Sequence, residues 1–277
     1  MYNGTRGLRL IRSSPAQSAG FARWRPHRIR DVLLAVLAFS AGSVDALSWL
    51  ALGKVFSAFM TGNVVFVAVG LYSDDAVLAL HAAIALAAFG AGAWATAAVM
   101  PREDPSVLWP ARVTAGLVGC ALVQLVFWVV WIVVGGHPGS TLVVLLAIAA
   151  FAMGVQTATA VALGVHAVFT TAATATWTVL VGDAAHWSET RLERRRLAMV
   201  LIGTFLGALA GALLLTDVRV WMPLLPALLT SGVAVVARHN LERHVDPTRT
   251  TVSAAAHPLN RGFGRAPSPD ASVPYAR

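Results

Sequence analysis

Charged residues and cysteine are scarce in this sequence. Only 12% of the 277 residues are charged, against about 25% in an average soluble protein, and 57% are hydrophobic. The single cysteine, Cys120, excludes an internal disulfide and stands in an apolar run without the Cys or His neighbours of a zinc or redox site. We therefore expect neither a metal nor a cofactor. A soluble globular protein is disfavoured from the outset.

The formal net charge of +8 does not mark a nucleic-acid-binding face. The basic residues cluster at the two ends of the chain and in one internal stretch, Arg191 to Arg196. This distribution is typical of a membrane protein whose basic segments remain in the cytoplasm. The sequence therefore predicts the lipid bilayer as a partner and no nucleic acid.

Long apolar stretches dominate the rest of the chain. A helix needs about 20 mostly apolar residues to cross the roughly 30 Å hydrocarbon layer. Two stretches are shorter, Phe56–Leu71 and Phe169–Gly182, and six approach or meet that length: Val32–Gly53, Val77–Met100, Val113–Val134, Thr141–Leu163, Leu197–Leu215 and Val220–Ala237. The sequence predicts an all-α polytopic membrane protein with six long transmembrane helices and two short helical segments that are either re-entrant or tilted.

Polar, Arg-rich tails flank the apolar region. Residues 1–31 and 238–277 contain too little apolar surface to form a core, and we expect both to be disordered. Basic residues near the spans predict that both tails and the Arg191 cluster are cytoplasmic, in the inner membrane of a bacterium. With six spans, 19 basic residues lie inside and two outside, whereas eight spans divide them 17 to four. The charge rule favours six spans and leaves eight open.

The two halves of the apolar region resemble each other. Residues 33–46 align with residues 145–158 with seven identities in fourteen positions, including Gly42 with Gly154. A short polar-headed segment and then a helix rich in small residues follow in each half. We therefore predict two membrane repeats, residues 32–134 and 141–237. Paired short segments at matching positions are typical of secondary transporters and indicate a binding site at mid-membrane depth.

Small residues recur every fourth position in the helix that follows each short segment. Gly203, Gly207 and Gly211 do so in the second half, and Ala83, Ala87, Ala91 and Ala95 in the first. This spacing places small side chains on one helical face, where a second helix can approach closely. We expect these faces to pack against helices, either within the chain or in a homo-oligomer.

The motifs of the first half resemble a known family. Gly42-Ser-Val-Asp45-Ala46 followed by Met60-Thr61-Gly62-Asn63 is similar to the YoaK-like family of bacterial integral membrane proteins, long catalogued as a domain of unknown function. The resemblance covers about residues 30–240. In the second half Gly154, Gln156, Thr170 and Thr171 fit the pattern, but Ala175 stands where glycine is expected. The resemblance implies a polytopic inner-membrane protein and brings no substrate.

Asp45 is the strongest candidate for a functional residue. A carboxylate within a span is costly unless it is paired, hydrated or neutral, so Asp45 should face the helix bundle or a water-filled cavity. It could couple proton or cation movement to transport, or it could form a structural hydrogen bond between helices.

Two further polar groups could bind a solute or an ion. Thr61, Gly62 and Asn63 open the first short segment, where a helix start could hold an anion at mid-membrane depth or form only a capped turn at the surface. The second half offers a neutral group of amide and hydroxyl side chains. Its candidates are Gln156, Thr170, Thr171 and Thr174.

The architecture favours a secondary transporter or permease for a small solute or ion, and no enzyme activity is expected. A membrane scaffold or assembly partner is the alternative. An intramembrane aspartyl protease that uses Asp45 and Asp183 is a remote alternative, because the residues before Asp183 do not match the Gly-x-Gly-Asp pattern of such proteases. An anionic lipid is a further candidate partner, at Arg191, Arg194, Arg195 and Arg196.

Overall fold

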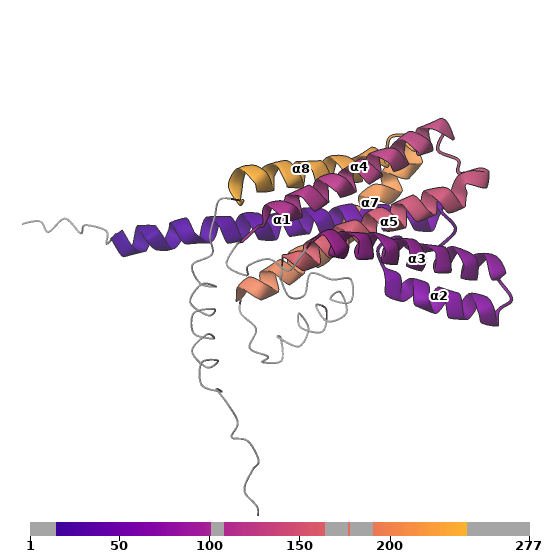
Figure 1. Ribbon diagram of the computed structural model, residues 1–277, viewed down its shortest axis with the longest axis horizontal. Coiled ribbons are helices and arrows are strands. Elements are labelled where there is room, and N and C mark those ends of the chain that lie inside the picture. The colour runs from indigo at the N-terminus through magenta and orange to yellow at the C-terminus, as the bar shows by residue number, and fades with distance from the viewer. Residues whose placement is uncertain (1–14, 101–107, 164–176, 178–190, 243–277) are drawn as a thin grey trace, which may run out of the picture.

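A computed structural model describes residues 15–100, 108–163, 177 and 191–242. All regular structure in this part of the chain is helical (Figure 1). The α-helices are α1 (Pro15–Ala51), α2 (Met60–Tyr72), α3 (Ala76–Val99), α4 (Ala111–Val133), α5 (Leu142–Ala162), α7 (Arg191–Asp217) and α8 (Leu224–Asn240), with the short 3-10 helix η1 (Gly139–Thr141) before α5. Five of the helices are long and apolar enough to cross a membrane, namely α1, α3, α4, the η1–α5 stretch and α7.

The helix bounds differ from the sequence predictions at both ends of the bundle. α1 begins at Pro15, inside the segment predicted to be a disordered tail through residue 31. Proline suits the first position of a helix, and the alanines and arginines that follow are good helix formers. The predicted span Val220–Ala237 is wrong in its bounds, because turns occupy residues 218–223 and α8 begins after Pro223. With 17 residues, α8 is shorter than the five long helices.

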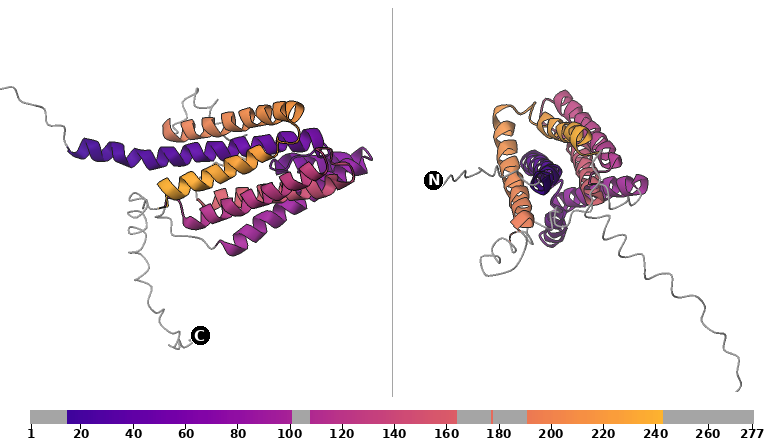
Figure 2. Two further views of the ribbon diagram at one scale, coloured as in Figure 1. Left: turned by 90° about the horizontal axis from the view of Figure 1, so that it is seen from above. Right: turned by 90° about the vertical axis from the view of Figure 1, so that its left-hand side faces the viewer.

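α1 lies at the centre of the bundle. It packs along α7 on one side and contacts α8 and α5 on others, while α3 packs along α5 and α4 along both α5 and α8 (Figure 2). The colours of Figures 1 and 2 show that α1, α4 and α7 run in one direction and α3, α5 and α8 in the other. The first long helix of each predicted half packs along the second long helix of the other half: α1 along α7, and α5 along α3.

Glycines make these two crossings close. A Cβ on Gly207 would overlap the carbonyl oxygen of Phe39 in α1, and a Cβ on Gly42 would overlap that of Thr204 in α7. Gly203 and Gly211 lie against Ala35 and Ser43 in the same way, one turn to either side along the helix pair.

The crossing of α3 and α5 has the same pattern. Gly92 lies against the carbonyl oxygen of Phe151, and Gly154 against that of Phe89. In the alignment of the two halves, Phe151 and Gly154 are the counterparts of Phe39 and Gly42. Corresponding residues of the two halves therefore make corresponding contacts.

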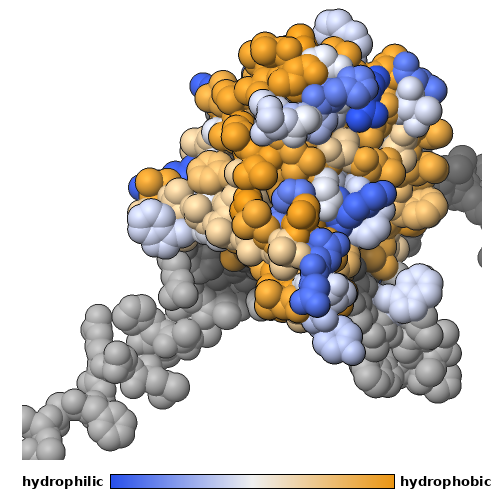
Figure 3. Space-filling view, turned by 90° about the vertical axis from the view of Figure 1, so that its right-hand side faces the viewer, coloured by the Kyte–Doolittle hydropathy of each residue, from blue (hydrophilic) through white to orange (hydrophobic). Residues whose placement is uncertain are grey.

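The outer faces of the helices are apolar. Large hydrophobic side chains stand exposed on α2, α3, α7 and α8, among them Val64, Leu80, Phe205 and Leu228. Figure 3 looks onto the end of the bundle opposite the start of α1, where hydrophilic residues are mixed with a largely hydrophobic surface. Such an exterior is suited to lipid rather than to water.

Candidate functional site

Asp45 holds the loop that connects α1 to α2. Its Oδ1 accepts hydrogen bonds from the backbone N–H groups of Ser57, at 2.8 Å, and Ala58, at 2.7 Å. Successive N–H groups that converge in this way form a concave site for an anion. In this protein the anion is the side chain of Asp45.

Ser48 and Asn63 hold the same loop from its two flanking helices. The hydroxyls of Ser48 in α1 and Ser57 in the loop lie 2.5 Å apart. Asn63 in α2 accepts a bond of 2.9 Å from the N–H of Phe56 and donates one of 2.6 Å to its carbonyl oxygen. The loop therefore has side-chain partners for backbone groups that would otherwise be left without them in a membrane.

Aromatic rings and unusual backbone angles complete this corner. Phe56 stacks on Trp49 with ring centroids 5.4 Å apart, and the ammonium of Lys54 lies 5.8 Å from the Trp49 ring. Gly53 and Lys54 have positive φ angles of 92° and 61°, which lets the chain turn back immediately after α1. A Cβ at Gly53 would also overlap the ring of His81.

A cavity of about 280 Å³ lies beside Asp45; we call it the Asp45 cavity. Four elements contribute to it: α1, the loop before α2, α5 and α7. Its wall is mainly apolar with a few polar groups, as is usual for small-molecule sites. The lining residues are Leu34, Leu37, Ala38, Ala41, Gly42, Asp45, Ala58, Phe59, Gln156, Thr157, Ala160, Val200, Leu201 and Thr204.

Gln156 joins three helices at the wall of this cavity. Its Nε2 in α5 donates to the carbonyl oxygen of Leu37 in α1 at 3.1 Å, and its Oε1 accepts from the hydroxyl of Thr230 in α8 at 3.5 Å. The Thr204 hydroxyl donates within its own helix, to the carbonyl oxygen of Val200 at 3.0 Å.

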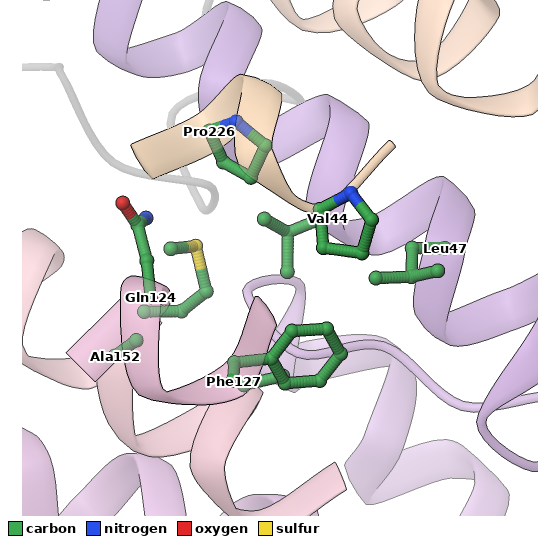
Figure 4. A pocket seen from close by; sticks show the side chains of 9 residues that line it. Val44, Leu47, Gln124, Phe127, Ala152 and Pro226 are labelled. Atoms are coloured by element: carbon green, nitrogen blue, oxygen red, sulfur yellow. The ribbon is translucent and has the colours of Figure 1, made fainter. Parts of the chain in front are cut away.

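A second buried amide has a different environment. Gln124 in α4 faces a void of only about 10 Å³, which we call the Gln124 void. Figure 4 shows Gln124 on one side of this void and Leu47 on the other, and the apolar side chains of Val44, Phe127, Ala152 and Pro226 also line it. Neither Nε2 nor Oε1 of Gln124 has a hydrogen-bond partner in the part of the chain that the structure describes.

The structure brings two of the candidate residues together and separates others. Asp45 and Gln156, from different halves of the chain, line the Asp45 cavity. Asn63 is fully buried but bonds to Phe56, and no side chain caps the start of α2. Thr61 is exposed, and Gly62 packs against the rings of Phe56 and Phe59.

The remaining candidates in the second half cannot be placed. Thr170, Thr171 and Thr174 lie outside the described residues, as do Asp183 and the predicted short segment Phe169–Gly182 apart from Trp177. Several residues of the site were not among the candidates, among them Ser57, Ala58 and Thr204. Ser57 and Ala58 act through backbone N–H groups, which have no signature in the sequence. For Thr204, the one signal was its position next to Gly203.

A helical bundle with an apolar exterior, five helices long enough to span a membrane and a carboxylate beside a cavity belongs to the class of polytopic membrane proteins. Comparison with known families identifies the particular one. Residues 33–236 match the model of the family described as "Protein of unknown function (DUF1275)", and the chain belongs to this family.

A curated relative supports this assignment. The chain is 29% identical over 219 residues to the UPF0700 transmembrane protein YoaK of Bacillus subtilis (strain 168), covering 76% of this chain and 96% of the relative. No solved structure matches the chain.

Proposed function

We propose that this protein is a secondary transporter or permease for a small solute and that the Asp45 cavity is its solute site. The observation that carries the proposal is the composition of the cavity wall. Both halves of the chain contribute to it, and the polar groups Asp45 and Gln156 stand in a largely apolar lining. Transporters of repeated build bind their solutes at the interface between the repeats.

The course of the helices supports six crossings in two inverted halves, residues 32–134 and 141–237. α1 and α5, the first helices of the halves, run in opposite directions (Figure 1). α2 lies against α3 and both join at one end of the bundle, as expected for a segment that enters and leaves on one side. Two halves inverted in this way could exchange conformations to expose a central site to either side.

The positions of the helix ends support the same topology and a cytoplasmic location of both termini. The start of α1, the end of α3, the start of α4 and the end of α8 lie at one end of the bundle (Figure 2). Arg112 and Arg238 stand at this end, whereas Lys54 and Arg219 stand at helix ends on the opposite side. Arg194, Arg195 and Arg196 at the start of α7 stand at the same end as Arg112 and Arg238, so this end has five of these seven basic residues. This excess follows the rule that basic residues stay inside.

In this proposal Asp45 couples transport to protons. Its carboxylate is the only formally charged group among the described residues that line the cavity. A proton on Asp45 and a bound cation are therefore alternatives at one position, and exchanging them would link proton flow to solute flow.

The test is proton movement in proteoliposomes that contain the purified protein and a pH-sensitive dye. Solute classes are added outside one at a time, and we expect one class to produce a dye response that protein-free liposomes lack. Asp45→Asn should remove this response. Asp74→Asn, an exposed control at a positive φ that asparagine tolerates, should retain it. Solute uptake without any dye response would refute proton coupling, and no uptake of any class would refute transport.

A scaffold function is the second candidate, and one observation favours it. Ala83, Ala87 and Ala91 form an exposed row on α3, and a Cβ on Gly90 beside them would meet open space. Such a face could receive a helix of another protein or of a second copy. The glycine row of α7, by contrast, is already covered by α1.

A further inference from the structure

We propose that the Asp45 cavity binds a small organic amine in its ammonium form, with an apolar body about the size of a six-membered ring. This inference rests on the proposed function, because it takes the cavity as the solute site. It adds the chemical class of the solute, which three features of the cavity determine: charge, hydrogen-bonding capacity and size.

Charge is the first feature. Asp45 contributes one carboxylate, and no Lys, Arg or His is among the described residues that line the cavity. An ionised carboxylate in a membrane interior requires a positive partner or strong hydrogen bonds. Its Oδ1 is bonded to the N–H groups of Ser57 and Ala58, but a carboxylate has about four acceptor positions, so capacity remains for a ligand. An ammonium group supplies both a positive charge and donors.

The same contacts disfavour an anionic solute. The N–H groups before α2 would be the natural binding site for an anion, and the carboxylate of Asp45 already occupies those of Ser57 and Ala58. A second negative group beside Asp45 would be repelled at a distance where the surroundings offer little screening.

Hydrogen-bonding capacity is the second feature. The Thr204 hydroxyl and one N–H of Gln156 already donate to backbone carbonyls, of Val200 and Leu37. The Thr204 oxygen can still accept hydrogen bonds, because the hydroxyl is used only as a donor. The Gln156 oxygen accepts one bond, from Thr230, and an amide oxygen can accept a second. Thr157 adds one hydroxyl, which can donate or accept, and the Gln156 amide keeps its second N–H. Together with the free positions of the Asp45 carboxylate, the polar part of the cavity has more acceptors to offer than donors, which suits a ligand rich in N–H groups.

Size is the third feature. The volume of about 280 Å³ is roughly twice the ~150 Å³ of an apolar cavity that holds one benzene molecule. Leu34, Leu37, Val200 and Leu201 form the apolar wall of the cavity, and Phe59 adds an aromatic side chain to the lining. An alkyl or aryl ring can fill the apolar part while the ammonium lies at Asp45.

The experiment compares three ligands that share one body and differ in charge. Calorimetry on the purified full-length protein in lipid nanodiscs measures the binding of cyclohexylmethylamine, cyclohexylmethanol and cyclohexanecarboxylate. We expect the amine to bind at least tenfold more tightly than the alcohol and the carboxylate not to bind measurably. Equal or tighter binding of the alcohol or the carboxylate, or no measurable binding of the amine, would overturn the proposal.

Two variants locate the site and a third serves as the control. Asp45→Asn preserves an acceptor for the loop and removes the charge, so it should lower amine affinity at least tenfold and change alcohol affinity less than twofold. Ala38→Phe fills the cavity and should weaken both ligands. Asp74→Asn should bind like the unmodified protein. Amine affinity that survives both Asp45→Asn and Ala38→Phe would place the amine elsewhere and refute the site.

This measurement is independent of transport. Binding of the amine without uptake in proteoliposomes would support the amine class and refute the transporter function. Uptake of another solute class by a protein that does not bind the amine would support transport and refute the amine class.

Discussion

Two hollows that border α1 among the described residues, the Asp45 cavity and the Gln124 void, differ in size and in the state of their polar groups. The Asp45 cavity, between α1, α5 and α7, has a volume of about 280 Å³, and the Asp45 and Gln156 side chains in its wall are hydrogen-bonded. The Gln124 void, between α1, α4, α5 and α8, has about 10 Å³ and one amide without a partner among the described residues. The first has room for a solute and the second has room for at most about one water.

This difference separates a built site from a packing defect. In the Asp45 cavity the carboxylate and the amide each fix a neighbouring element: Asp45 holds the loop before α2, and Gln156 joins α5 to α1 and α8. Gln124 fixes nothing that the described residues show, and an unpartnered buried amide costs about 1–3 kcal/mol. A buried polar side chain alone is therefore a weak sign of a functional site. A stronger sign is a polar side chain that has hydrogen-bond partners and lies beside a cavity.

The largest effect should come from removing the acceptor at Asp45. Asp45→Leu leaves at least two loop N–H groups, those of Ser57 and Ala58, without a partner. At about 1–3 kcal/mol for each unsatisfied group, we expect a loss of about 2–6 kcal/mol in stability. The apparent Tm of the purified protein in detergent, followed by fluorescence-detected gel filtration after heating, measures this loss.

Asp45→Asn is the matched control for that prediction. The amide oxygen can accept the same two bonds, so this variant should lose less than half of what Asp45→Leu loses. Equal Tm values for the two variants would mean that the acceptor at this position does not hold the loop. The hydrogen bonds of Asp45 would then not explain its effect on stability.

A smaller effect should follow from widening the α1–α7 crossing that borders the Asp45 cavity. The added methyl group of Gly207→Ala would overlap the carbonyl oxygen of Phe39, so the two helices must move apart. Overpacking of this kind costs about 1–3 kcal/mol. Gly90→Ala makes the same chemical change in α3 where the new Cβ meets open space, and it should be neutral or slightly stabilising because alanine favours helix. Equal thermal stability of the two variants would show that the crossing is not tightly packed.

The sequence predicted the bounds of two long apolar helices well because the ends of these helices have strong signals. The predicted stretches Val77–Met100 and Thr141–Leu163 became α3, Ala76–Val99, and α5, Leu142–Ala162, with bounds one residue apart. Charged residues, glycine and proline border these helices, and lipid leaves few alternatives to a helix for a long apolar run. The extension of α1 back to Pro15 was missed because composition alone does not distinguish a polar helix from a disordered tail.

The site was harder to predict than the spans. Asp45 and Gln156 were identified as polar residues within apolar segments, but their partners are the loop backbone and the carbonyl oxygen of Leu37. Backbone partners leave no pattern in a sequence. For the same reason the role of Asn63 was not foreseen: it lies in the first turn of α2, as expected, but its oxygen and its nitrogen both bond to the backbone of Phe56.

The smallest effect, and one of opposite sign, should distinguish the two amides. Gln124→Met keeps nearly the same shape and removes an unpartnered polar group, so we expect stability to be unchanged or to rise by up to about 1 kcal/mol. Gln156→Met makes the identical change but removes the bond to Leu37 and leaves the Thr230 hydroxyl without its acceptor, which should cost about 1–2 kcal/mol. Apparent Tm values of both variants, measured side by side in one detergent, provide the comparison. Destabilisation by Gln124→Met equal to that by Gln156→Met would mean that Gln124 has a partner after all, such as a single water in the void, and the contrast between the two sides of α1 would fail.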